Sequence, residues 1–194
     1  MEDTGIRQSK MRTEKAKGKS RSTKTDMRVF MSLLDLYDAC LRNADKLLTE
    51  ARLLISHGHV ARAFALAYTG WEEVGKAQLV GDFANDMVSE EEFEDAFRDH
   101  TLKSAYNWRQ FVLNTKDVNA STIEYDRNRA RKAFEKRQAA FYVGKGALLK
   151  PLTPDKGVTK EEAEQVIRAL ATEIRHIREA DAMTERIGSA SFLK

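Results

Sequence analysis

Residues 60–84 read VARAFALAYTGWEEVGKAQLVGDFA, and this stretch decides the fold. One stripe of its helical wheel is apolar: Val60, Phe64, Ala67, Trp71 and Val74. More apolar residues lie well off that stripe: Ala65, Tyr68, Leu79 and Val80. A helix that is apolar on nearly every side is buried on nearly every side. The stretch therefore predicts a central helix with the rest of the chain packed around it.

The remaining sequence predicts four further helices, over about 27–56, 89–114, 122–143 and 159–187, because apolar residues recur there every three or four positions. Ser89 with Glu92, and Thr159 with Glu162, form capping boxes at two helix starts. Gly58 suits the end of the first helix. Both prolines, Pro151 and Pro154, fall in a connection that we expect to be a loop over 144–158.

These elements predict an all-α fold, a five-helix bundle in a single domain over residues 29–187 with a short tail over 188–194. Residues 1–28 carry nine Lys or Arg, four acids and only four large apolar side chains. Such a segment buries too little surface to offset its ordering entropy, so we expect a disordered basic tail. The tail either keeps the protein in solution or attracts nucleic acid through phosphate charge.

Composition narrows the classes of function. The single cysteine, Cys40, cannot form an internal disulfide, which fits a reducing cytoplasm and excludes zinc sites built on several cysteines. No apolar run approaches a membrane span, so we expect no membrane partner. Glu173 and His176 form one E-x-x-H pattern with no second copy, so we assign His176, with Arg175 and Arg178, to a solvated face. We predict neither a metal nor a cofactor.

Two of the predicted helices carry a candidate site. Glu72, Glu73 and Lys76 stand close together in the otherwise apolar central helix, where Glu72 and Lys76 are spaced to pair. The inward stripe of the next helix contains a histidine: Phe93, Phe97, His100, Ser104, Trp108 and Phe111. Lys103 follows one turn later. A histidine oriented by a carboxylate suits proton transfer, and lysines suit phosphate oxygens. The alternative is a structural ion pair with a hydrogen-bonded core histidine.

A run of basic residues marks the helix over 122–143: Arg127, Arg129, Arg131, Lys132, Lys136 and Arg137. Only Glu135 opposes them between residues 127 and 137. A charge run of this kind is either a solvated helix face or a surface for an RNA backbone.

Four segments in this order resemble a known family: AFALA at 63–67, EEVGK at 72–76, FRDHTLK at 97–103 and KRQAAFYV at 136–143. The chain is similar, over about 33–180, to the AbiV family of bacterial abortive-infection proteins. That family is grouped with the all-α HEPN superfamily, many of whose members are metal-independent RNases that act as dimers. The resemblance implies phage defence, in which the protein arrests growth or translation in infected cells.

The resemblance leaves two functions open. In the first, a homodimeric RNase uses His100 as its base, Glu72 or Glu73 to orient it, and Lys76 and Lys103 to hold phosphate. HEPN RNases carry R-x(4–6)-H, and the match in this chain is Arg52 to His57, a second candidate site at the end of the helix over 27–56. In the other, a non-catalytic protein binds RNA, the ribosome or a phage-encoded activator protein.

Overall fold

The computed structural model describes residues 23–85, 88–100, 103, 120–145 and 147–182. The predicted basic tail lies outside them up to residue 22, and the predicted tail over 188–194 lies outside them entirely. The predicted domain boundaries therefore stay predictions. Residues 23–28, however, are helical and belong to the first helix. They contain neither glycine nor proline, so nothing in them ends the helix earlier.

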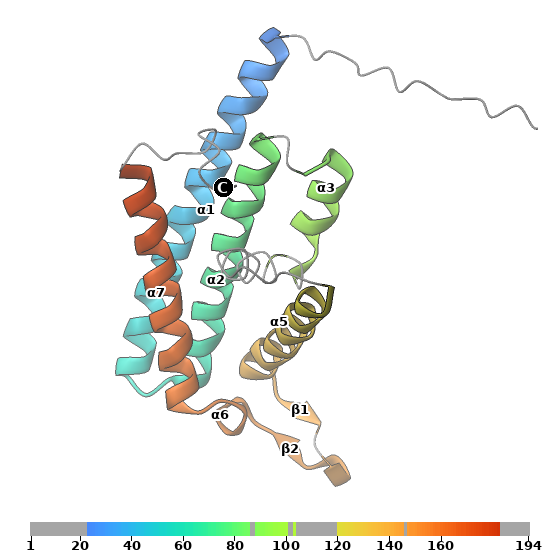
Figure 1. The fold of residues 1–194 in the computed structure, drawn as a ribbon. Helices are drawn as coiled ribbons and strands as arrows, with labels where there is room; N and C mark the ends of the chain where they lie inside the picture. The colour runs from blue at the N-terminus through green and yellow to red at the C-terminus, as the bar shows by residue number, and fades with distance from the viewer. Residues whose placement is uncertain (1–22, 86–87, 101–102, 104–119, 146, 183–194) are drawn as a thin grey trace, which may run out of the picture.

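The fold is all-α, as predicted (Figure 1). The helices are α1 Thr23–Ser56, α2 Val60–Ala84, α3 Glu90–Arg98, α5 Ala120–Phe141, α6 Pro154–Gly157 and α7 Lys160–Ala182, and η1 is a 3₁₀ turn over Ala147–Leu149. The strands β1 Gly144–Lys145 and β2 Pro151–Leu152 are two residues each. None of the described helices combines the length and apolar character that crossing a bilayer requires.

α2 is the centre of the bundle, which confirms the prediction from its apolar wheel. It packs against α1, α3, α5, α6 and α7, and Figure 1 shows it between α1 and α7 on one side and α3 and α5 on the other. Most of its residues are buried. Gly70 lets α7 come close, because a Cβ there would lie 2.6 Å from Cδ2 of Leu170. The buried stripe of α7 completes the core: Ile167, Leu170, Ile174 and Ile177.

Three of the predicted helix-end signals are confirmed: Gly58, and the capping boxes at Ser89 and Thr159. Gly58 has a φ of 80°, a left-handed conformation that glycine adopts without steric cost. The Ser89 hydroxyl accepts a hydrogen bond from the Glu92 backbone N–H, and the Glu92 carboxylate accepts one from the Ser89 backbone N–H. Thr159 and Glu162 form the same reciprocal pair at the start of α7.

The single helix expected over 89–114 is wrong, because α3 ends at Arg98. Asp99 is extended, with φ −85° and ψ 118°, and the chain is helical again at His100. The Asp99 carbonyl accepts from the Lys103 N–H at 3.1 Å, so Asp99 stands where one helical turn ends and another begins. Aspartate favours helix starts over helix interiors. Residues 104–114 lie outside the described chain, and with them Ser104, Trp108 and Phe111.

The connection over 144–158, expected to be a loop, contains a small antiparallel hairpin and the short helix α6. In the hairpin, Gly144 pairs with Leu152 and Lys145 with Pro151. Pro154 opens α6, where its missing N–H would have no helical partner. α5 covers 120–141 where the sequence predicted 122–143, a shift of two residues at each end.

Candidate functional site

The buried carboxylate of Glu72 is the centre of the site. Its side chain is only 3% exposed in the middle of α2. Oε2 accepts a hydrogen bond from Nη1 of Arg137 on α5 at 2.9 Å. The same oxygen lies 3.0 Å from Nδ1 of His100, just beyond α3. Three segments far apart in sequence thus meet at one oxygen, while Oε1 has no hydrogen-bond partner among the described residues.

His100 contacts Glu72, as the sequence analysis expected, but it does not occupy a core position. Its side chain is 50% exposed. The break at Asp99 takes His100 off the stripe that Phe93 and Phe97 occupy in α3, so the prediction of a core histidine is wrong. The imidazole stacks on Phe134 of α5, with ring centroids 5.5 Å apart and an interplanar angle of 24°. One nitrogen is therefore held by Glu72 while much of the ring faces solvent.

Arg137 is the residue whose place the sequence analysis missed. It belongs to the basic run expected on a solvated or RNA-binding face, yet it is 8% exposed. Its guanidinium carbon lies 4.8 Å from the centroid of the Phe134 ring and its Nη1 donates to Glu72. The available signal was its periodicity, because Arg137 shares one stripe of α5 with Ala130, Phe134 and Ala140. Ala130 and Ala140 are fully buried. Arg137 therefore belongs to the site and not to the solvated face.

Glu73 and Lys76 form a second group beside the first. Lys76 donates to Glu73, one turn earlier, and not to Glu72 as the spacing of four residues suggested. Its Nζ also lies 5.9 Å from the centroid of the Phe97 ring. On the α1 side, burial and the Glu73 carboxylate raise the pKa of the Cys40 thiol to about 11. This thiol stays protonated at neutral pH, which makes it a poor nucleophile.

Lys103 is buried, although it carries an amine. Its Nζ donates to the Phe97 carbonyl at 3.0 Å, and the residue is 4% exposed. Burial lowers the pKa of this amine, and the positive charge of Lys76 lowers it further, whereas Glu72 and Glu73 act in the opposite sense. The polar residues predicted on two separate helices therefore do come together. Lys103 reaches them from inside the protein and not from the solvent.

The second candidate pair, Arg52 and His57, lies elsewhere. His57 is exposed at the end of α1, where its Nδ1 lies 2.8 Å from the Leu53 carbonyl oxygen. Arg52 lines a shallow depression beside α7. Val60 begins α2 next to this turn, and the twelve helical steps from Val60 to Glu72 span about 18 Å. The structure does not bring this pair to the Glu72 site.

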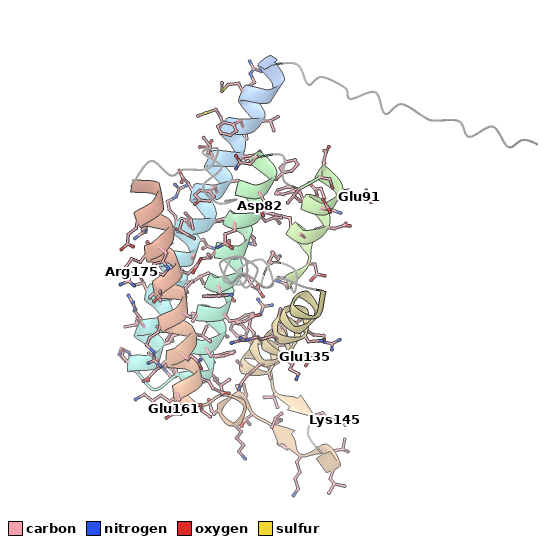
Figure 2. All side chains as sticks on the ribbon, viewed as in Figure 1. Asp82, Glu91, Glu135, Lys145, Glu161 and Arg175 are labelled. Atoms are coloured by element: carbon pink, nitrogen blue, oxygen red, sulfur yellow. The ribbon has the colours of Figure 1, made fainter. Side chains whose placement is uncertain are left out.

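The two residues of the E-x-x-H pattern differ in burial, and only His176 lies on the exposed face. Glu173 is half-buried and its Oε1 accepts from Nε2 of Gln78 on α2 at 3.1 Å, while His176 is exposed. Burial raises the pKa of Glu173. Arg175, labelled in Figure 2, is exposed, and the exposed Arg178 pairs with Asp45 of α1. Within the described ranges, no three His, Cys, Asp or Glu side chains are grouped so that they could hold a metal ion.

The rest of the basic run divides into two sets. Arg129, Arg131 and Lys132 are exposed on α5, as is Glu135, labelled in Figure 2; the Arg127 side chain lies outside the described part. Lys136 is half-buried and pairs with Glu162. The hydrogen bond from Lys136 and a second one from the Thr159 N–H lower the pKa of Glu162. A groove of about 340 Å³ separates α5 from α2 and α7. Its walls include three of these cations and three aromatics: Arg129, Lys132, Lys136, Phe64, Tyr68 and Trp71.

Of the comparisons with known proteins, the one with protein-family models gives a match. No curated protein and no solved structure matches the chain. A family model described as AbiV matches residues 32–175, about three quarters of the sequence and nearly the range over which the resemblance was expected. The matched range contains Glu72, His100 and Arg137. The chain therefore belongs to the AbiV family of HEPN domains.

Proposed function

We propose that this protein is an abortive-infection effector that acts inside phage-infected cells and arrests growth by cleaving RNA at the Glu72 site. One observation carries the proposal. The half-exposed imidazole of His100 is held by a buried carboxylate, Glu72, which is itself held by a buried guanidinium, Arg137. General-base catalysis uses this kind of arrangement, in which a second group orients the base and a third group positions the second.

The arrangement assigns a direction to proton transfer. When Nδ1 of His100 carries the proton, it donates to Glu72, and Nε2 is the basic nitrogen. Nε2 takes the proton of a ribose 2′-OH, and the 2′ oxygen attacks the adjacent phosphorus. The 5′ oxygen leaves and takes a proton from water, and the hydroxide so formed takes the proton back from Nε2. The products are a 2′,3′-cyclic phosphate end and a 5′-OH end. Glu72 stabilises the imidazolium that forms.

The exposed cations of α5 are better placed for phosphate than the lysines expected from the sequence. Lys103 is buried and Lys76 pairs with Glu73. Arg131, in contrast, is exposed and precedes Phe134 by three residues, so it lies on the part of α5 that stacks on His100. We assign phosphate binding to Arg131, with Arg129 and Lys132 extending the contact along the helix.

A purely structural role would not need His100. The Glu72 carboxylate is already paired with Arg137, and a half-exposed imidazole adds little to the burial of that pair. Removal of His100 should therefore cost activity and not stability, which separates the two interpretations.

The test uses His100→Ala, with His176→Ala as the exposed-histidine control and His57→Ala as the test of the second candidate pair. We expect His100→Ala to lower the rate of RNA cleavage in EDTA by about 100-fold or more while the melting temperature stays unchanged. In induced cells the same variant should restore growth, RNA integrity and protein synthesis, and His176→Ala should remain toxic. Loss of toxicity in His57→Ala would instead support the second candidate pair. A folded His100→Ala protein that still cleaves RNA would remove His100 from the mechanism. Tight RNA or ribosome binding without cleavage by the wild type would favour the non-catalytic alternative.

The proposal includes a homodimer, as expected from the family resemblance. Light scattering should then give about twice the chain mass of 22.1 kDa. A monomer mass at the concentration of the activity assay would contradict this part of the proposal and leave the role of His100 standing.

A further inference from the structure

The connection between α5 and α7 carries an unusual concentration of exposed apolar side chains. Among the residues that the structure describes, ten large apolar side chains are exposed, and six of them fall between residues 141 and 152: Phe141, Tyr142, Val143, Leu148, Leu149 and Leu152. Leu148 is 90% exposed and Leu149 is 71% exposed. Scattered exposed leucines are ordinary, but a contiguous apolar patch marks a surface that contacts something else.

Folding does not explain the two leucines at the tip. Leu148 has a φ of 54° and Leu149 a φ of 62°, both in the left-handed region. Glycine, asparagine and aspartate are the residues that adopt this conformation readily, whereas leucine is strained there. Neither side chain gains burial in return. Strained residues of this kind cluster at functional positions.

The charge and polarity of the segment indicate the contacting surface. Residues 141–152 contain two lysines, Lys145 and Lys150, and no acid. They also contain no serine, threonine, asparagine or glutamine. Protein interfaces carry about one hydrogen bond per 100–200 Å² and have a polar rim, and lysine is depleted in them. An apolar tip flanked by lysines and a tyrosine instead matches an anionic bilayer, which takes apolar groups below its headgroups and cations beside them.

The hairpin is also in a position to reach a flat surface. Figure 1 shows β1, η1 and β2 projecting beyond the end of the bundle, past α6, with η1 farthest from the helices. Lys145 lies on this projection in Figure 2. The pairing of Gly144 with Leu152 and of Lys145 with Pro151 closes the base of the projection. The tip can therefore contact a membrane without the helices meeting it first.

We propose that residues 141–145 and 147–152 bind the protein to the surface of an anionic lipid bilayer, with Leu148 and Leu149 inserted among the headgroups and Lys145 and Lys150 beside lipid phosphates. This differs from the expectation of no membrane partner, which was based on the absence of a spanning segment. Surface insertion needs only a short apolar tip and nearby cations. The inference is independent of the RNase proposal.

The test is co-sedimentation of the full chain with vesicles of phosphatidylcholine mixed with phosphatidylglycerol, compared with phosphatidylcholine alone. The informative variant is Leu148→Asn with Leu149→Asn, because asparagine tolerates the left-handed conformation and leaves the charge unchanged. Leu53→Gln, an exposed leucine on α1, is the matched control. We expect the wild type and the control to sediment with the anionic vesicles, and the double variant to lose at least about tenfold in partitioning. The melting temperature of the double variant should stay equal or rise.

A second variant checks the lysines. Lys145→Ala with Lys150→Ala should weaken binding to the anionic vesicles and reduce its dependence on salt. Absence of sedimentation with anionic vesicles would overturn the proposal. The proposal would also be overturned if the double leucine variant bound the anionic vesicles as strongly as the wild type. Lipid binding would then be assigned to the basic residues at the start of the chain. A changed oligomeric mass in that variant, with lipid binding intact, would show that the tip contacts protein and not lipid.

Discussion

Two parts of the helix α5 carry cationic side chains, which are exposed in one part and buried in the other. Arg129, Arg131 and Lys132 face solvent, whereas Arg137, less than two turns further on, is buried against Glu72. In the sequence they form one basic run. In the structure they form a surface that can attract phosphate and, separately, one half of a buried ion pair.

The difference shows that charge density along a sequence does not define a surface on a helix. Side chains three, four and seven residues apart share a face, so a run of eleven residues covers every side of the helix. Arg137 falls on the stripe of Ala130 and Phe134 and is drawn inward with them. There its charge is tolerated only because Glu72 lies 2.9 Å away.

The largest expected effect comes from breaking the buried pair. Arg137→Met should lower the free energy of unfolding by about 3–5 kcal/mol, because it leaves the Glu72 carboxylate buried without its guanidinium. Arg131→Met, on the solvated face of the same helix, should change it by less than about 0.5 kcal/mol. Urea denaturation followed by circular dichroism measures both. Equal small effects would show that Arg137 is not held in the interior.

The double variant sharpens this result. Glu72→Met with Arg137→Met replaces the ion pair by apolar side chains, so it should recover much of the stability that Arg137→Met loses. Additive losses in the two single variants would instead mean that the two residues do not interact. Because the double variant keeps His100 but removes its carboxylate, it should be inactive toward RNA.

A smaller effect is expected at Lys103, which resembles Arg137 in being buried but carries an amine that can lose its charge. Its folded pKa lies below the value of 10.5 that it has when unfolded. Between these two values the unfolded chain binds more protons, so stability rises with pH across that window. Lys103→Met removes the cost of the buried charge. The variant should be more stable than the wild type by about 1 kcal/mol at neutral pH.

The dependence on pH tests the cause of that change. The advantage of Lys103→Met should shrink as the pH rises toward 10.5, since above that value the wild-type amine is neutral in both the folded and the unfolded state. Lys132→Met, in which an exposed lysine is replaced, should show no such trend. Melting curves recorded from pH 7 to pH 10.5 give the comparison. A constant difference across this range would attribute the effect to packing.

The smallest effect on stability, but a distinct effect on binding, is expected on the exposed side of α5. Lys132→Ala should leave the free energy of unfolding within about 0.5 kcal/mol of the wild type. If this side contacts RNA phosphates, the slope of log affinity against log salt should fall by about one for each cation removed. An unchanged slope for both Arg131→Ala and Lys132→Ala would show that this face of α5 contacts solvent and not RNA.

The fold could be predicted from the sequence to within a few residues, because the bundle depends on patterns that repeat along the chain. The apolar wheel of residues 60–84 identified the central helix, and the capping boxes at Ser89 and Thr159 identified two helix starts. The one large error was the helix over 89–114. Its apolar period continues past residue 98, and the preference of Asp99 for a helix end is too weak a signal to outweigh that period in the sequence alone.

The candidate site could be predicted only in part. Glu72 was recognised as a charge that the central helix would bury, and His100 as its neighbour, and the two are 3.0 Å apart. The exposure of His100 could not be predicted, because it depends on the break at Asp99. The pairing of Lys76 with Glu73 and not Glu72 depends on which carboxylate Arg137 already occupies.

By itself, the sequence determined the all-α class, the central helix, the family and the residues from which a site could be built, since each of these depends on local periodicity or on residue identity. Only the tertiary structure decided which of them meet. Arg137 and Glu72 are 65 positions apart, and no local pattern specifies that contact. The contact forms because α5 packs against α2. The buried carboxylate of Glu72 needs a cation as a partner, and Arg137 lies on the face of α5 that packs against it.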